Sequence, residues 1–432
     1  MAVTTNYLVT GNGITGSTAN AVQALVSGAG KTSAVARLGG LSVASVSATD
    51  VTRGLKLEAE APFSRVRIRL YSEGGAATNF RVAVGATETM ATDSANNLSE
   101  LVVGGTVYNA ERASDGAPGW VLGAVAGATT FDWPGVAAAD LPKELVTDWI
   151  DVRSVPRADG GSRPALSIRV QHAGSTNGDW AGFNCSAWTA GVAGYPWARG
   201  FIAYSVTGSG VTDLTLTTGS IATSVVWIAV EFDYDTPART VMGIGDSHFE
   251  QHGGNAVGVH GTWLFQACAA ASTTARPVQL FNAGRSGGGA ALFTTNGLAE
   301  IARVRPHTVC YLPITSNDGA PTAASVRAAQ SRIAAVRAAC ADVGARLVLV
   351  TGIPMTSSQT ANSAADALRL SVTQHCAALA GAGVATHVDM EDILGTGASP
   401  NRIRSEYLAD GTHFNQAAAE PMAARMAPLL AA

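Results

Sequence analysis

Three residues in the second half of the chain carry side chains that can act together on a carbonyl group. Ser247 follows an apolar run in the segment GIGDSH, and a serine hydroxyl is a weak nucleophile until a base lies beside it. Near the C-terminus, the segment LADGTHFN places Asp410 three residues before His413. On a helical or tight-turn segment, this spacing puts both side chains on one side. The carboxylate can then fix the imidazole tautomer, which leaves Nε2 free to face Ser247. The pattern predicts Ser247 as nucleophile, His413 as base and Asp410 as orienting acid.

Acyl transfer also needs hydrogen-bond donors at the place where the carbonyl oxygen becomes negatively charged. The segment FNAGRSGG contains Gly284, which lets a backbone N–H approach a substrate closely. In the segment TSND, Asn317 offers a side-chain amide. Together with the Ser247 N–H, these donors follow three different predicted strands. They predict an oxyanion hole formed by Ser247, Gly284 and Asn317.

The polar segments belong to a predicted α/β unit that covers residues 237–432. Apolar strands such as TVMGIGD and RLVLVTGIP alternate with helical stretches, up to a last strand in THVDMEDIL and a terminal helix in QAAAEPMAARMAPLL. This alternation predicts a parallel sheet with helices on both faces. Ligands bind such sheets at the carboxyl ends of the strands, and all the polar segments lie there.

Residues 56–236 show the period of two that is typical of half-buried strands. Segments such as FSRVRIRLYS and VVWIAVEFDY alternate apolar and polar side chains between turns rich in Gly, Asp and Pro. Many short strands of this kind predict an antiparallel β-sandwich, here an accessory domain. Tryptophans in this zone can stack on sugar rings, but filling the sandwich core is the favoured role for Trp120, Trp133, Trp149, Trp180, Trp188 and Trp197.

Residues 1–55 are rich in Ser, Thr, Gly and Ala, so we expect an attachment arm or flexible lead-in with little core. The N-terminus lacks the basic and apolar regions of a secretory signal, which predicts a protein that is cytoplasmic or released without such a leader. No apolar run approaches the roughly 20 residues of a membrane span. A net charge of −4 argues against an extended nucleic-acid interface. The sequence leaves the oligomeric state open.

Neither a cofactor nor a metal site is expected. The cysteines include no C-x-x-C pair, which indicates reduced, structural thiols at Cys185, Cys268, Cys310, Cys340 and Cys376. The glycine pattern GNGITG at 11–16 has no acidic residue after it before Asp50, unlike a dinucleotide site. The segment GAGKTS at 28–33 has Leu25 where a phosphate-binding loop needs its leading glycine, and HFEQH at 248–252 has Phe249 where a zinc-protease helix needs glutamate.

Taken in order, the polar segments resemble the sequence blocks of the SGNH hydrolases, the GDSL esterase/lipase superfamily. The matching residues are Gly245-Asp246-Ser247, Asn282-x-Gly284-x-Ser286-Gly287, Asn317-Asp318 and Asp410-x-x-His413. The resemblance covers roughly residues 238–432. It implies the same roles for the serine, the histidine and the three oxyanion donors, and a three-layer α/β/α sandwich with a parallel, flavodoxin-like sheet of about five strands. Two residues depart from the blocks: Thr315 replaces a glycine, and His248 replaces a leucine.

These observations predict a serine esterase that hydrolyses carboxylic esters on a small molecule or a polysaccharide. The adjacent sandwich suggests acetyl groups on carbohydrate, by analogy of fold alone, and short acyl chains suit a sequence without a long apolar lid. A lipid or aryl esterase of the same mechanism is the nearest alternative. A carbohydrate-binding or structural protein with a vestigial hydrolase domain is the alternative from another class.

Other polar residues near these segments are expected to have structural roles. A solvated position at the start of a helix is favoured over a place at the pocket rim for His248, Glu250 and His252. An ordinary surface position is expected for Arg285. Helix capping and loop hydrogen bonds are expected for Asp389, Glu391 and Asp392.

Overall fold

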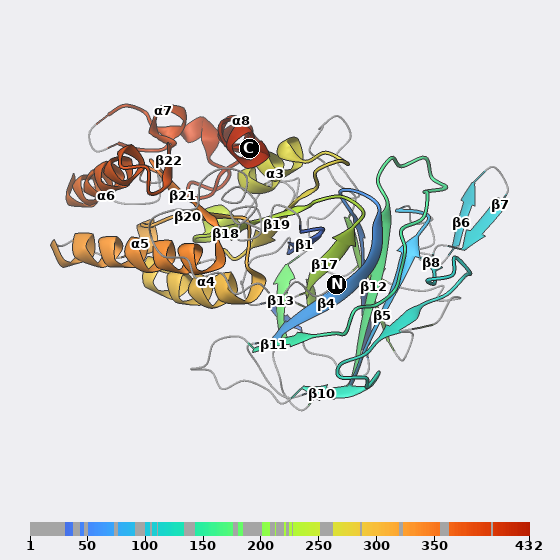
Figure 1. Ribbon diagram of the computed structural model, residues 1–432. Helices are drawn as coiled ribbons and strands as arrows, with labels where there is room; N and C mark the ends of the chain where they lie inside the picture. Colours follow the sequence, from blue (N-terminus) through green and yellow to red (C-terminus); the bar gives the residue numbers. More distant parts are fainter. Residues whose placement is uncertain are drawn as a thin grey trace, which may run out of the picture.

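The computed structural model shows an α/β half and a β-rich half that pack side by side (Figure 1). It describes residues 31–37, 44–46, 51–72, 77–90, 100–103, 106–109, 111–133, 143–175, 180–184, 201–207, 212, 220–221, 224–226, 228–250, 262–285, 287–318, 323–354, 363–398 and 401–432. All five residues of the predicted catalytic site lie in these ranges. Residues 11–16, His252, Cys185, Trp188, Trp197 and Ser286 lie outside them.

The α/β half contains a five-stranded sheet in the order β19-β18-β20-β21-β22. Its strands are β18 (Arg239–Ile244), β19 (Val278–Asn282), β20 (Thr308–Tyr311), β21 (Arg346–Thr351) and β22 (Thr386–Asp389). Every neighbouring pair is parallel. Strand β19 is buried along its whole length, as expected where helices cover both faces of a parallel sheet. The predicted parallel sheet is confirmed.

Helices cover both faces of this sheet (Figure 1). On one face, α4 (Ala290–Val304), α5 (Ala323–Val343) and α6 (Ser363–Gly381) bury side chains such as Phe293 and Ile333. On the other face, α3 (Trp263–Ala271) and α8 (Gln416–Ala431) bury Trp263 and Met422. The predicted α/β/α sandwich is therefore confirmed.

The last strand is shorter than the sequence predicts. Strand β22 ends at Asp389, and Glu391–Leu394 forms a short helix, α7. The Glu391 N–H donates to Asp389 Oδ1 at 3.0 Å, so the Asp389 carboxylate stabilises the start of the helix.

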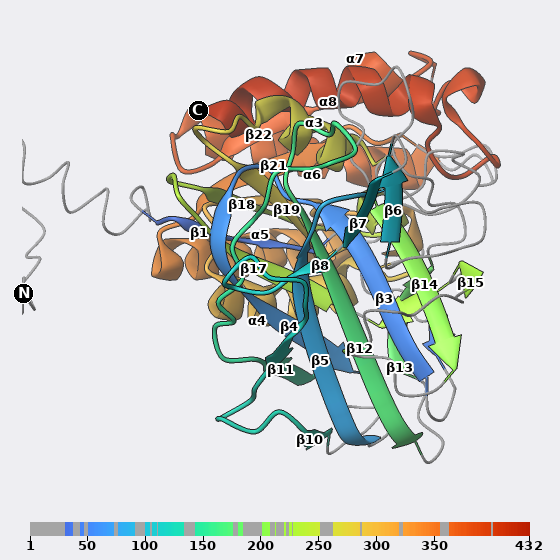
Figure 2. The ribbon, with the colours of Figure 1, turned by 90° about the vertical axis from the view of Figure 1, so that its right-hand side faces the viewer.

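The first half consists mainly of antiparallel sheets, as predicted. One sheet has the order β1-β17-β4-β11, and a larger one has the order β10-β5-β12-β3-β14-β15, with β8 and β9 paired to β5. Figure 2 shows β5, β12, β3 and β14 side by side. The bounds are β1 (Ser33–Ala36), β3 (Val51–Glu58), β4 (Phe63–Ser72), β5 (Ala77–Thr87), β8 (Glu111–Arg112), β9 (Val121–Gly123), β10 (Phe131–Trp133), β11 (Lys143–Val146), β12 (Ala165–Ser175), β14 (Phe201–Thr207), β15 (Ser220–Ile221) and β17 (Ile228–Tyr234).

Two smaller sheets complete this half. A three-stranded sheet joins β16 (Ser224–Val226), β13 (Trp180–Asn184) and β2 (Ala44–Val46). A hairpin joins β6 (Glu100–Val103) to β7 (Thr106–Asn109). The change of hydrophobic period near residue 236 coincides with the turn between β17 and β18.

Residues 31–37 differ from the expected arm, because they form an ordered part of the core. Strand β1 pairs with β17, and Val35 is fully buried. Arg37 extends the parallel sheet by one residue: its N–H donates to Leu280 O at 2.9 Å, and its carbonyl accepts from Asn282 N–H at 2.8 Å. The N-terminal segment therefore connects the sandwich to the edge of the parallel sheet.

The Arg37 side chain is buried between the two halves. It lies over the Phe281 ring at 4.0 Å and 3.6 Å from the Glu300 carboxylate. The apolar residues of the sandwich and those around α4, α5 and α6 form one continuous cluster. The two halves therefore share a core.

The tryptophans that can be placed do not fill the sandwich core. Trp120 and Trp149 are half-buried and stack against arginines, Trp120 under Arg169 at 4.1 Å and Trp149 under Arg65 at 4.6 Å. The core interpretation is wrong for these two residues, because arginine side chains cover their rings. In the described ranges the cysteines are free and buried, as predicted, at Cys268, Cys310, Cys340 and Cys376. No described helix has the length and apolar character needed to cross a bilayer.

Candidate active site

Ser247 follows the carboxyl end of β18, an inner strand of the parallel sheet, in the turn that starts the short helix α2 (Ser247–Glu250). Gly245 makes this turn possible, because a Cβ there would lie 2.6 Å from the Phe249 ring. The Phe249 and Glu250 N–H groups both donate to the Asp246 carbonyl at 3.0 Å. Ser247 is the first residue of α2, where a backbone N–H has no acceptor within the helix.

Asp410 and His413 lie in a tight turn just before α8. The turn is closed by a hydrogen bond from Ala409 N–H to His413 O at 2.8 Å, and Gly411 adopts a positive φ of 84°. Asn415 then caps α8 by accepting from the Ala418 N–H at 3.2 Å. The backbone of His413 is thus held by the tight turn that precedes it and by the helix cap that follows it.

A chain of hydrogen bonds links the three predicted residues. His413 Nδ1 lies 2.8 Å from Asp410 Oδ2, and His413 Nε2 lies 3.1 Å from Ser247 Oγ. A carboxylate only accepts hydrogen bonds, so Nδ1 carries the proton and the neutral imidazole presents the Nε2 lone pair to Ser247. This geometry allows the serine hydroxyl to donate to a base.

The Asp410 carboxylate stays ionised over a wide pH range. Partial burial raises its pKa, but hydrogen bonds from the His413 side chain and from the His413 and Thr412 N–H groups outweigh this and lower the pKa to about 2. The backbone bonds measure 2.8 Å and 3.0 Å. They also fix the carboxylate in its orientation toward the imidazole.

Gly284 lies on the loop after β19, directly beside α2. A Cβ at this position would lie 2.5 Å from the Glu250 N, so only glycine fits. The next residue, Arg285, is half-buried, and its N–H donates to Gly245 O at 2.9 Å, which ties this loop to the nucleophile turn. The Gly284 N–H itself donates to Asn282 Oδ1 at 3.0 Å.

Asn317 lies on the loop after β20 and is exposed. Its side-chain amide donates to Gly288 O at 3.4 Å, so it contacts the loop that carries Gly284. The structure therefore brings Ser247, His413 and Asp410 into direct contact and places Gly284 and Asn317 on the adjoining loops. The donors of these last two residues are bonded to protein atoms.

No protein-family model matches the chain, and no curated protein matches it. Solved structures do match. They include a GDSL-like lipase from Bacteroides thetaiotaomicron VPI-5482, with 16% identity over 44% of this chain and 87% of that chain and a TM-score of 0.34. A variant of Axe2, an acetyl-xylooligosaccharide esterase from Geobacillus Stearmophilus, matches with 15% identity over 44% and 94% of the two chains, at a TM-score of 0.32. The psychrotrophic esterase EstA from Pseudoalteromonas sp. matches with 18% identity over 45% and 92%, at a TM-score of 0.31.

The observed architecture of the α/β half agrees with the α/β/α fold that the sequence resemblance implies. The parallel sheet is five-stranded, has helices on both faces and carries the four polar segments at its carboxyl edge. The α/β half therefore has the three-layer architecture that the sequence resemblance to the SGNH hydrolases implies. The loops after β18, β19 and β20 and the turn before α8 correspond to the four sequence blocks of that family.

The two departures from the SGNH blocks meet at one carboxylate. Asp246 Oδ1 accepts from the His248 N–H at 2.9 Å and lies 3.1 Å from His248 Nδ1, and Asp246 Oδ2 accepts from the Thr315 hydroxyl. His248 and Glu250 are both buried, so their expected role as solvated helix-start residues is wrong. Sequence reasoning did not assign a function to Asp246, His248 or Thr315. The only signal was that two of the three differ from the family pattern.

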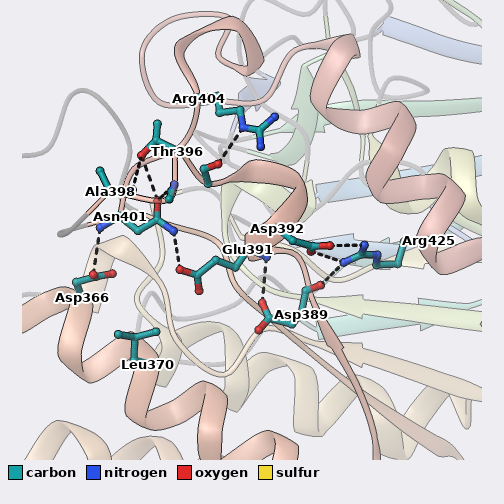
Figure 3. A pocket seen from close by; sticks show the side chains of 12 residues that line it. Asp366, Leu370, Asp389, Glu391, Asp392, Thr396, Ala398, Asn401, Arg404 and Arg425 are labelled. Carbon is teal, nitrogen blue, oxygen red and sulfur yellow. Dashed lines mark hydrogen bonds and ion pairs between the residues drawn. The ribbon is translucent and has the colours of Figure 1, made fainter.

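A hollow of about 780 Å³ is lined by residues of α6, α7 and α8 and of the loop after α7 (Figure 3). Its polar side chains bond to one another: Glu391 pairs with Arg369 and with Asn401, and Asp392 pairs with Arg425. The expected structural roles of Asp389, Glu391 and Asp392 are borne out by these contacts. Among the residues that the structure describes, no group of His, Cys, Asp and Glu side chains is arranged to hold a metal ion.

Proposed function

We propose that this protein is a serine esterase that hydrolyses carboxylic esters. The observation that carries the proposal is the continuous hydrogen-bond chain from Asp410 through His413 to Ser247, at the carboxyl edge of an SGNH-type sheet. The donor and acceptor roles in this chain are those that activate a serine hydroxyl.

The first half-reaction forms an acyl-enzyme. Ser247 Oγ attacks the ester carbonyl carbon, and His413 Nε2 takes the hydroxyl proton. Asp410 stabilises the imidazolium that results. When the tetrahedral intermediate collapses, the bond to the alcohol oxygen breaks and the His413 proton passes to the leaving alcohol. Water then attacks the acyl-enzyme by the same steps and releases the carboxylic acid.

The negative oxygen of the intermediate needs donors, and three lie on adjoining loops. The Ser247 N–H at the start of α2, the Gly284 N–H and the Asn317 amide are the groups we assign to this role. Since the last two are bonded to Asn282 Oδ1 and Gly288 O, substrate oxygen would replace or share these acceptors.

We also propose short acyl groups, such as acetyl on carbohydrate, as the substrate class. The segment after the nucleophile, residues 251–261, reads QHGGNAVGVHG and contains no long apolar run that would cover an extended acyl chain. The sandwich half shares its core with the hydrolase half, which allows it to border the substrate site. A lipid or aryl esterase remains the alternative.

Two assays test the proposal. Wild-type protein should hydrolyse p-nitrophenyl acetate, and Ser247→Ala should not, whereas equal rates in both would indicate a vestigial hydrolase domain. A panel of acetylated sugars beside p-nitrophenyl esters of increasing chain length should show the highest kcat/KM for acetyl groups. A preference for long chains would exclude the proposed substrate class.

A further inference from the structure

His248 connects the nucleophile turn to the turn that carries His413. Its Nδ1 lies 3.1 Å from Asp246 Oδ1, and its Nε2 lies 3.1 Å from the Thr412 carbonyl oxygen. Ser247 lies between Asp246 and His248 in the chain, and Thr412 directly precedes His413. This connection therefore runs beside the hydrogen bond from Ser247 to His413. Of these two hydrogen bonds between the turns, only the one from Ser247 to His413 takes part in proton transfer.

Both partners of the His248 ring are hydrogen-bond acceptors. A backbone carbonyl cannot donate, and Asp246 already accepts from the His248 N–H and the Thr315 hydroxyl, which favours its ionised form. Because each ring nitrogen faces an acceptor, the geometry points to a proton on both nitrogens, that is, to an imidazolium at His248. Burial lowers the pKa of His248, but the Asp246 carboxylate outweighs this and raises it. Burial raises the pKa of Asp246, and the charge and hydrogen bonds of His248 lower it below its ordinary value.

We propose that His248 is a positioning residue of this esterase, which holds the Thr412 carbonyl and thereby keeps His413 within reach of Ser247. This inference rests on the proposed function. During acyl transfer the Ser247 hydroxyl loses its proton to His413, and the original hydrogen bond no longer exists. The imidazolium bridge does not change in that step, so it maintains the distance between the two turns.

The same carboxylate also reaches the loop that carries Asn317. The Thr315 hydroxyl donates to Asp246 and accepts from the Asn317 N–H at 3.3 Å. The Asp246 carboxylate thus connects the nucleophile turn with the histidine turn through His248 and with the Asn317 loop through Thr315. The glycine and leucine of the SGNH pattern have no side-chain donors that could make these bonds. His248 and Thr315, the two departures from the family pattern, thus act together through their shared partner Asp246.

Loss of the His248 proton should weaken the bridge at alkaline pH. In the part of the chain that the structure describes, three titratable groups face the His248 ring: Asp246 from its own turn, and Asp410 and His413 from the turn before α8. The residues that α3 and the Asn317 loop contribute, Trp263 and Thr315, are uncharged. A neutral imidazole has one N–H and loses either the Thr412 or the Asp246 bond. The pKa of His248 in the folded protein is raised from 6.5. The stabilisation that the bridge gives to the two turns is therefore complete below pH 6.5, and it is lost as the pH rises through the pKa of His248 in the folded protein.

The kinetic test compares three variants on p-nitrophenyl acetate. His248→Gln keeps a donor where Nε2 meets Thr412, His248→Asn keeps a donor only toward Asp246, and His248→Leu restores the family residue without any donor. We expect kcat to fall about 100-fold in the Asn and Leu variants, as when a reacting group is misplaced by about 1 Å. The Gln variant should stay within about tenfold of wild type, because a neutral hydrogen bond replaces a charged one.

The pH profile separates positioning from simple packing. Wild-type kcat should fall at alkaline pH, and this fall should be absent in His248→Gln, which has no proton to lose. Equal kcat in all three variants, or an alkaline fall that persists in the Gln variant, would overturn the proposal while the esterase function stands.

An NMR measurement on the wild-type protein needs neither activity nor a folded variant. The ¹⁵N shifts of His248 should show both ring nitrogens protonated at pH 7. His387, whose pKa burial lowers, should show a neutral ring and serves as the internal control. A neutral His248 at pH 7 overturns the bridge whether or not the protein hydrolyses esters. Failure of the proposed function shows itself separately, as the absence of any ester hydrolysis in wild type.

Discussion

Replacing Asp410 with asparagine tests whether the carboxylate orients and charges the base. The Asp410 Oδ2 to His413 Nδ1 distance is 2.8 Å, and the Asp410 side chain is 42% exposed. Unit charges about 4 Å apart attract by about 1 kcal/mol in water and about 4 kcal/mol at an effective dielectric constant of about 20. A half-exposed carboxylate lies between these limits, and the two limits correspond to factors of about 5 and about 900 in kcat. The asparagine amide also faces Nδ1–H with a donor and favours the wrong tautomer.

We therefore expect kcat to fall about 100- to 1,000-fold in Asp410→Asn, less than the roughly 10⁴-fold loss seen when a buried triad acid is replaced. His413→Ala removes the base and should cost about 10⁴-fold or more. The double variant should be scarcely slower than His413→Ala, because an orienting group has no effect once the base is gone.

The assay is steady-state hydrolysis of p-nitrophenyl acetate, with Asp392→Asn as the matched control. Asp392 is an exposed acid that pairs with Arg425 at the far edge of the sheet, and its replacement should leave kcat unchanged. Asp410 does not orient the base if Asp410→Asn keeps more than about a third of wild-type kcat, or if the Asp410 and His413 effects multiply in the double variant.

The remaining predictions concern acid pH, the glycine beside α2 and the contact between the halves. The pKa of Asp410 is lowered from 3.8 to about 2, so its carboxylate is fully ionised above pH 3.8 and should add no second step to the acid side of the pH–rate profile. We therefore expect kcat/KM to fall on the acid side with a single protonation. Gly284→Ala should lower kcat at least about tenfold because its Cβ would lie 2.5 Å from the Glu250 N, whereas Gly381→Ala, with nothing within 4 Å, should behave as wild type in the same assay. Arg37→Ala leaves the buried Glu300 carboxylate with its ion pair to Arg303 but without Arg37, and should lower the free energy of unfolding by about 1–3 kcal/mol in urea melts; an unchanged free energy would show that the contact is not important.

The α/β half could be predicted from the sequence because its signals are local. Apolar strands such as RLVLVT and long helical stretches alternate in the chain, and the segments with Ser247, Gly284 and Asn317 each follow a strand directly. Since parallel strands end at one edge of a sheet, the proximity of the loops with Ser247, Gly284 and Asn317 follows from topology. The pairing of His413 with Ser247, across 166 positions, was predicted from the chemistry of the two residues.

Contacts between distant segments could not be predicted in the same way. Nothing in a Ser/Thr/Gly-rich segment indicates that Arg37 pairs with β19 and lies buried against Phe281, because its neighbours in sequence do not set that contact. His248 looks like a solvated residue at a helix start, and only the fold places Asp246 and Thr412 on either side of its ring. The sequence predicts a strand that runs on to Leu394, because the capping bond of Asp389, which starts α7, depends on the local backbone conformation.

The most direct test of the central claim is labelling with a fluorophosphonate probe, followed by intact-mass and peptide analysis of wild type and Ser247→Ala. A hydroxyl that donates to a base at 3.1 Å should react where ordinary serines do not. We expect one adduct per wild-type chain, on the peptide that contains Ser247, and none in the alanine variant, which should keep the wild-type melting temperature. An adduct on another residue, or an alanine variant that still hydrolyses p-nitrophenyl acetate at the wild-type rate, would contradict this expectation.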